Sequence, residues 1–161
     1  MVVFRPRPGF VFSHPAHLIA FGFGAGLAPF APGTAGTALG WALGWALGGL
    51  YPGVLLLTAV VFFVLGLWAC EITGRHLGIA DHGGMVWDEV VAFLLVLAFV
   101  PQELVWQAAA FVAFRFFDIA KPPPIRHFER RYSGGFGVMF DDLLAAVYTL
   151  LLLALITRLF F

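Results

Sequence analysis

The sequence predicts an all-α fold, a compact membrane-embedded helical bundle of about five short hydrophobic helices, forming a single domain over residues 1–161. Hydrophobic residues make up 61% of the chain and charged residues only 11%, against roughly a quarter charged in an average soluble domain. A chain of this length cannot hide so much apolar surface in a water-soluble core. Lipid is therefore the expected solvent for most of the apolar side chains.

The net charge of the chain is zero, so bulk electrostatics indicate no nucleic-acid partner. The single cysteine, Cys70, cannot form an intramolecular disulfide and lies in an apolar run. This favours a buried packing role over a nucleophile. Neither the composition nor the charge indicates an oligomeric state.

The first element, the N-terminal segment 10–32, is apolar but repeatedly broken by glycine and proline. The breaks are Gly22, Gly24, Gly26, Pro29 and Pro32. They disfavour a cleaved signal peptide, which needs an uninterrupted apolar core. They suit an interfacial or re-entrant segment that is buried against protein.

Five apolar stretches follow, and each is expected to form a membrane helix. They are 35–50, 53–70, 87–100, 104–118 and 141–160. All but the last are shorter than the roughly 20 residues that cross a bilayer core. We therefore expect local thinning of the bilayer, incomplete crossing or mutual burial of the helices.

The first of these stretches carries glycines spaced four residues apart. They are Gly36, Gly40, Gly44 and Gly48. On a helix these positions form one smooth stripe, which predicts that another helix approaches closely there. The stripe indicates packing and not chemistry.

The connections between the stretches differ in charge. The turns at 50–53 and 100–103 contain no basic residue, whereas the N-terminus and the loops 71–86 and 119–140 do. The positive-inside rule places the basic connections in the cytoplasm. Eight of the nine acidic residues also fall within 71–89 or 118–142. The sequence therefore predicts a multi-pass protein with its polar chemistry at one cytoplasmic face.

Two acidic pairs, Asp88–Glu89 and Asp141–Asp142, stand at predicted helix starts. They have a structural interpretation as helix caps that interact with the positive end of the helix dipole. The alternative is a metal site, because charge this close to lipid is costly and Mg²⁺ prefers carboxylate oxygens together with substrate phosphate. The candidate ligands for one or two Mg²⁺ ions are Asp81, Asp88, Glu89, Asp141 and Asp142, with Asp118 nearby.

Basic and hydroxyl side chains near these acids are candidates for binding phosphate. Arg115, Asp118 and Lys121 share one helix face, and the "KPPPI" sequence ends that helix directly after Lys121. A salt-bridged surface ladder would explain the same spacing. Arg126 is a weaker phosphate candidate, and Thr34 and Thr37 in "PGTAGT" stand at a predicted helix N-terminus, where they could equally be a cap.

Four stretches of this chain resemble stretches of the phosphatidylglycerophosphatase A family, whose members are bacterial membrane lipid phosphatases. They are "FGFGAGLAPFAPGTAGT", "DHGGMVWDEVV", "FRFFDIAKPPPIRHFER" and "GGFGVMFDDLLAAVY". The order of the motifs is the same, whereas the C-terminal tail, the third proline of "KPPPI" and the basic N-terminus depart from the pattern.

The resemblance implies a Mg²⁺-dependent enzyme of the bacterial inner membrane that converts phosphatidylglycerol phosphate to phosphatidylglycerol and inorganic phosphate. The implied catalytic residues are Asp88, Glu89, Asp118, Lys121, Asp141 and Asp142, and the implied partner is the phospholipid substrate. Two alternatives remain: an ion-binding transporter or channel, and a structural membrane protein. Acids at helix ends beside basic residues favour a phosphate site over the acids in mid-span that a transporter needs.

Overall fold

Every regular element of the described structure is helical. The computed structural model describes residues 6–47 and 52–160, and no strand occurs within these ranges. The elements are α1 (Pro8–Val11), α2 (Pro15–Ala20), the 3-10 helix η1 (Gly22–Leu27), α3 (Pro32–Leu47), α4 (Pro52–Leu77), α5 (Trp87–Leu97), α6 (Leu104–Ala120), α7 (Ile125–Arg131) and α8 (Gly134–Phe160). The all-α prediction is confirmed. Gly48 and the first half of the predicted 50–53 turn lie outside the described residues.

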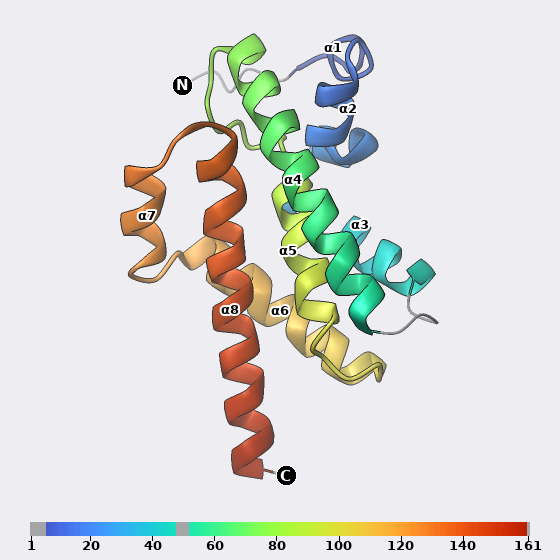
Figure 1. The fold of residues 1–161 in the computed structure, drawn as a ribbon, viewed down its shortest axis with the longest axis vertical. Helices are drawn as coiled ribbons and strands as arrows, with labels where there is room; N and C mark the ends of the chain where they lie inside the picture. The colour runs from blue at the N-terminus through green and yellow to red at the C-terminus, as the bar shows by residue number, and fades with distance from the viewer. Residues whose placement is uncertain (1–5, 48–51, 161) are drawn as a thin grey trace.

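Helix α5 lies at the centre of the bundle, where α3, α4 and α8 pack around it (Figure 1). Every residue of α5 except Leu95 is buried. The helix is also shorter than the predicted stretch 87–100, because it has 11 residues and ends at Leu97. A helix that is apolar on all sides is one that other helices enclose. This stretch forms the core of the bundle and does not face lipid.

The predicted glycine stripe on α3 is the surface on which α5 packs. A Cβ atom added at Gly36 would lie 2.6 Å from Val86 Cβ, and one added at Gly40 would lie 2.8 Å from the Val90 carbonyl oxygen. A Cβ at Gly44 would collide with Leu97. Only glycine permits this approach of the two backbones, because any side chain would occupy the space of the neighbouring helix.

The Gly40→Leu variant is expected to lose stability by about 1–3 kcal/mol. The added side chain would meet backbone atoms of Val90, which cannot rotate out of the way. Thermal unfolding in detergent measures the effect. Gly53→Leu is the matched control, because a Cβ there meets nothing within 4 Å. An equal loss in both variants would show that the stripe has no special packing role.

Helices α4 and α8 are longer than predicted, at 26 and 27 residues. Both are long and apolar enough to cross a membrane, judged by length and composition. The prediction that 53–70 is too short for an untilted crossing is therefore wrong, since α4 continues to Leu77. Helices α3 and α6 have 16 and 17 residues. The predicted loop 119–140 also contains a helix, α7.

The start of α8 is set by a contact from α4. Glu71 Oε2 accepts a hydrogen bond from the Gly135 backbone N–H at 2.8 Å, and this satisfies one of the free donors at the helix N-terminus. As a result α8 begins at Gly134, and Asp141 and Asp142 lie in its second and third turns. The interpretation of these two acids as caps is wrong, because a different acid caps this helix.

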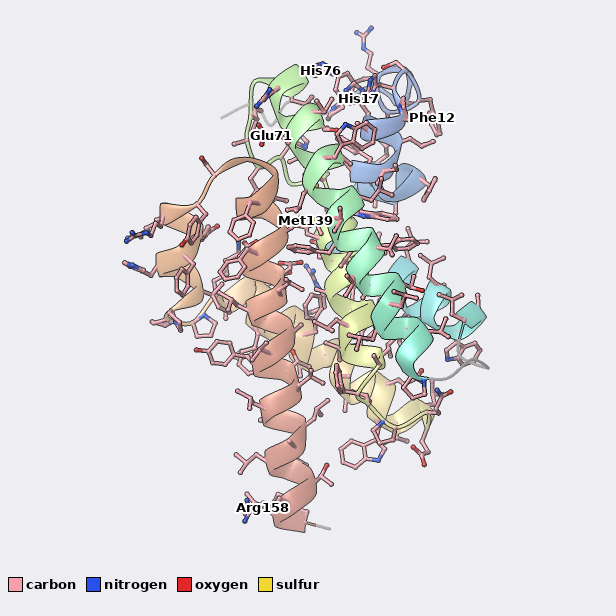
Figure 2. All side chains as sticks on the ribbon, in the orientation of Figure 1. Phe12, His17, Glu71, His76, Met139 and Arg158 are labelled. Atoms are coloured by element: carbon pink, nitrogen blue, oxygen red, sulfur yellow. The ribbon has the colours of Figure 1, made fainter. Side chains whose placement is uncertain are left out.

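The N-terminal segment forms α1, α2 and η1 beside the C-terminal half of α4, at the opposite end of the bundle from the C-terminus (Figure 1). Two contacts fasten it there. The Val86 backbone N–H donates to the Ala20 carbonyl at 2.8 Å, and the rings of His17 and His76 are hydrogen-bonded at 2.8 Å. Figure 2 shows both histidines at this end and Arg158 at the other. The segment is thus packed on protein along much of its length.

Candidate functional site

Three carboxylates from two helices meet inside the bundle. Asp88 and Glu89 come from the first turn of α5, and Asp142 comes from α8. Each contributes an oxygen atom, and these atoms all lie within 4.8 Å of one another. The exposed fractions of the three residues are 8%, 9% and 3%. We call Asp88, Glu89 and Asp142 the acid cluster.

The position of the acid cluster follows from how α8 crosses α4 and α5. Met139, one turn before Asp142, lies where α8 passes α4 (Figure 2). A Cβ atom at Gly66 of α4 would lie 2.6 Å from Met139 Sδ and 2.8 Å from the Trp87 ring. The Trp87 indole N–H also donates to the Phe62 carbonyl at 3.0 Å. These contacts fix the start of α5 against α4 and α8 and so bring the carboxylates together.

The acid cluster has the properties of a cation site. One oxygen of each carboxylate is buried without a hydrogen-bond partner among the described residues: Asp88 Oδ1, Glu89 Oε2 and Asp142 Oδ2. Buried like charges at this separation repel each other and also lose their hydration. A divalent cation would offset both costs. An all-oxygen set of ligands without histidine or cysteine suits a hard cation such as Mg²⁺.

Arg115 on α6 brings a positive charge to the acid cluster. Its Nη1 atom lies 2.6 Å from Asp118 Oδ2 and 3.5 Å from Glu89 Oε1, and it donates to Thr37 Oγ1 at 3.4 Å. Its Nε atom is buried without a hydrogen-bond partner among the described residues. Asp118 also lies close enough to Asp142 for the two carboxyl groups to interact. Arg115 therefore has an unused donor beside the cluster.

The N-terminal end of α3 closes another side of the site. A Cβ atom at Gly33 would collide with Glu89 Oε1 and lie 2.9 Å from Arg115 Nη2. Thr37 is fully buried, and its hydroxyl donates to the Gly33 carbonyl at 2.9 Å. Thr34 is half-buried in the same turn. The predicted phosphate-binding segment thus lies at the site, with Thr37 in contact with Arg115.

Lys121 bridges two acids instead of continuing the face of Arg115 and Asp118. It ends α6 in a left-handed conformation with φ 42°. Its Nζ atom lies 2.5 Å from Asp141 Oδ2 and 2.9 Å from Glu129 Oε1. Partial burial opposes the charge of Lys121, but the hydrogen bonds and charges of Asp141 and Glu129 outweigh burial and raise its pKa. The ammonium group stays protonated throughout the physiological range.

The predicted ligands thus divide into two groups. Asp88, Glu89 and Asp142 form the acid cluster, whereas Asp141 pairs with Lys121. Asp81 lies with Asp141 and Glu129 along a separate cavity of about 220 Å³. Asp141 Oδ1 is buried without a hydrogen-bond partner among the described residues. Arg126, the weaker phosphate candidate, is exposed on α7.

The sequence did not single out Glu71 or Glu129, which position other parts of the site. Both residues fall in the acid-rich ranges 71–89 and 118–142, and this was the only feature of the sequence that could have indicated them. The role of Glu129 depends on α7 turning back toward Lys121, and that of Glu71 depends on the crossing of α4 and α8. Neither arrangement has a local sequence pattern.

Comparison with known proteins identifies the relatives of the chain. The sequence model of the family described as Phosphatidylglycerophosphatase A matches residues 18–157. Two curated relatives carry that same name. The Haemophilus influenzae protein is 46% identical over 86% of this chain and 86% of its own length, and the Escherichia coli protein is 40% identical over 84% and 79%. A Bacteroides thetaiotaomicron protein, provisionally named a phosphatidylinositol-3-phosphatase, is 42% identical over 85% of this chain and 90% of its own length. No solved structure matches the chain.

Proposed function

The chain belongs to the phosphatidylglycerophosphatase A family and is a phosphatidylglycerophosphatase, and we propose that the acid cluster is the centre of its reaction. The reaction converts phosphatidylglycerol phosphate to phosphatidylglycerol and inorganic phosphate. The observation that supports this location is the group of buried, unpartnered carboxylate oxygens of Asp88, Glu89 and Asp142. The two alternative functions, a transporter or channel and a structural membrane protein, do not agree with membership of a family of phosphatases.

The acid cluster is the proposed holder of a divalent cation, with Mg²⁺ favoured by the all-oxygen ligands. When bound, such a cation supplies Lewis-acid polarisation of phosphoryl oxygens. The buried oxygens of Asp88, Glu89 and Asp142 are the proposed ligands, because each lacks another partner. Asp118 holds Arg115 in place and does not itself belong to the cluster.

Two cations of the chain are proposed to bind the terminal phosphate. The unpartnered Nε of Arg115 is available to donate to a phosphate oxygen, and a guanidinium suits the geometry of such oxygens. Lys121 supplies a permanent charge beside Asp141, the residue before Asp142 of the acid cluster, and is oriented by Asp141 and Glu129. Preorganised charges of this kind stabilise the transition state of phosphoryl transfer.

Asp141 has a second proposed role. One of its oxygens is held by Lys121, while Oδ1 is buried without a partner among the described residues. A carboxylate oxygen in this position is a candidate acceptor for the proton of an attacking water. The neighbouring Asp142 faces the acid cluster instead, so the two adjacent acids serve different functions.

Phosphate release from phosphatidylglycerol phosphate in detergent micelles tests the proposal. The purified protein is expected to release phosphate, to lose that activity on chelation of divalent cations, and to regain it with Mg²⁺. Absence of release under all conditions would contradict the function, and release that persists after chelation would contradict the cation. Phosphatidylinositol 3-phosphate, assayed in parallel, is expected to have a lower kcat/KM.

We further propose that the protein is a multi-pass protein of the bacterial inner membrane, with its site facing the cytoplasm. Helices α4 and α8 support a membrane location by their length and composition. The basic helix α7 lies toward the end of the bundle that holds α1 and α2, whereas the α5–α6 connection and the C-terminus lie at the other end (Figure 1). The positive-inside rule assigns the basic end to the cytoplasm.

Cysteine labelling in intact cells is expected to reach Gln102→Cys and not Ser133→Cys. The reagent must be unable to cross the inner membrane, and the background variant Cys70→Ala removes the buried native thiol. Both positions are exposed in the structure, so a difference in labelling reports the side of the membrane. Ser133→Cys must become labelled once the cells are opened. Labelling of Ser133→Cys alone in intact cells would reverse the orientation.

A further inference from the structure

A cavity of about 500 Å³ lies between the N-terminal segment, the start of α3 and the loop before α5. Its walls include Pro8, Leu27, Pro29, Pro32 and Gly83. None of its described lining residues carries an acidic, lysine or arginine side chain, and His82 is the one titratable group. The cavity thus differs in character from the charged site beside it.

The cavity lies next to the proposed catalytic centre, because residues that line it are neighbours in sequence of residues at the acid cluster. Pro32 lines the cavity, and the next residue, Gly33, presses against Glu89 and Arg115 so closely that a Cβ would collide with Glu89. On the other wall, Gly84 lies four residues before Asp88. A phospholipid whose terminal phosphate occupies the acid cluster would therefore have this cavity near the parts of the molecule that follow its head group.

The walls of the cavity are held by close backbone contacts. A Cβ atom at Gly26 would collide with the Gly84 carbonyl, and one at Gly84 would lie 2.6 Å from the Phe21 ring. His82 Nδ1 accepts a hydrogen bond from the Gly84 backbone N–H at 3.0 Å. Several prolines further restrict the backbone. The cavity is preformed, so that a ligand need not order it.

Aromatic side chains on the same segment are exposed. Phe30, between the lining residues Pro29 and Pro32, is 87% exposed, and Phe12 and Phe23 also face outward. An exposed apolar side chain beside such a cavity, as Phe30 is, marks contact with lipid or with another apolar partner. The continuity with a lipid phosphatase site favours lipid.

We propose that this cavity binds the beginning of an acyl chain of the phospholipid substrate, which enters past Phe30 while the terminal phosphate lies at the acid cluster. This inference rests on the proposed function of the acid cluster. The cavity does not suit the second phosphate group of the substrate, since none of its described lining residues offers a buried phosphate a lysine or arginine partner to offset the loss of its hydration. The acyl chain matches the apolar lining.

Filling the cavity tests the proposal. Ala28→Trp adds a large side chain at a half-buried lining position outside the charged site, and Ala28→Leu makes a smaller change. Activity is compared on dioleoyl phosphatidylglycerol phosphate and on the deacylated head group, which carries the same terminal phosphate. For Ala28→Trp, kcat/KM on the lipid is expected to fall at least about tenfold, because excluding two or more methylene groups has an effect of that size. Ala28→Leu is expected to give an intermediate loss.

The ratio between the two substrates distinguishes the outcomes. On the head group, both variants are expected to stay within about threefold of the unmodified protein. Ala109→Trp, which adds the same side chain at an exposed position of α6, controls for the bulk of tryptophan. Equal losses on both substrates in both Ala28 variants, or no loss in either, would overturn the acyl-chain assignment. Failure of the unmodified protein to act on the lipid would instead overturn the proposed function.

A binding measurement that does not depend on turnover completes the test. Phosphatidylglycerol with a photoactivatable diazirine near the start of one acyl chain is incorporated into micelles with the protein and irradiated. The label is expected on residues 26–32 or 82–84, and to decrease in Ala28→Trp. Labelling confined to the outer faces of α4 and α8 would contradict a bound chain in the cavity.

Discussion

Asp142→Asn is expected to lower turnover by at least about 10²-fold, the scale on which preorganised electrostatic groups act. The substitution keeps the size of the side chain but removes one of three carboxylates whose oxygens converge within 4.8 Å. A helix cap cannot explain such a loss, because Asp142 lies well inside α8 and Glu71 caps that helix. Phosphate release at several Mg²⁺ concentrations measures the effect, and high Mg²⁺ is expected to restore part of the activity.

A second measurement separates a cation site from a structural role. Mg²⁺ is expected to raise the Tm of the unmodified protein, since a ligand that binds only the folded state stabilises it. Asp142→Asn is expected to reduce that increase, while the metal-free variant is at least as stable as the unmodified protein because one buried like charge is gone. Glu103→Gln, at an exposed acid outside the site, is the control for acid-to-amide changes. A metal-free Asp142→Asn protein that unfolds more easily, with its Mg²⁺ response intact, would contradict the cation site.

Lys121→Ala is expected to lower kcat by about 10²-fold or more, because it removes the preorganised charge that we propose stabilises the transferring phosphate. No other lysine exists in the chain to replace it. The pKa of Lys121 is raised by Asp141 and Glu129, so the loss should be independent of pH across the neutral range. Affinity for Mg²⁺ should stay the same or rise, since a neighbouring positive charge has gone.

The comparison of Lys121→Ala with Asp142→Asn across a Mg²⁺ titration distinguishes the two roles. Excess Mg²⁺ should restore activity only in Asp142→Asn. Glu129→Gln, which removes the more exposed partner of Lys121 and leaves Asp141 in place, is expected to have a smaller effect than Lys121→Ala. Restoration of Lys121→Ala by Mg²⁺ would instead assign Lys121 to holding the acids in place, and the phosphate would then bind to Arg115 or Arg126.

Several features of the site could be predicted because they depend only on the order of the residues in the sequence. The acids concentrate in two ranges of the chain, and the motif order matches a family of lipid phosphatases. The glycine spacing on α3 predicted a close helix contact, and Gly36, Gly40 and Gly44 make it with α5. The lengths of α4 and α8 were less predictable. Helix α4 continues through the more polar segment 71–77, and α8 begins at the glycine-rich residues 134–137, and both segments lie outside the apolar stretches that hydropathy detects.

The sequence by itself determined the helical class, the apolar composition and the identity of the charged residues, because hydropathy and motifs are properties of the chain order. Only the tertiary structure decided which charges meet. Adjacent residues on a helix point about 100° apart, so Asp142 turns toward Asp88 and Glu89 while Asp141 turns toward Lys121. The burial of α5 was also decided by the tertiary structure, because its apolar sequence suits lipid and protein equally well. It became the core because α3, α4 and α8 surround it.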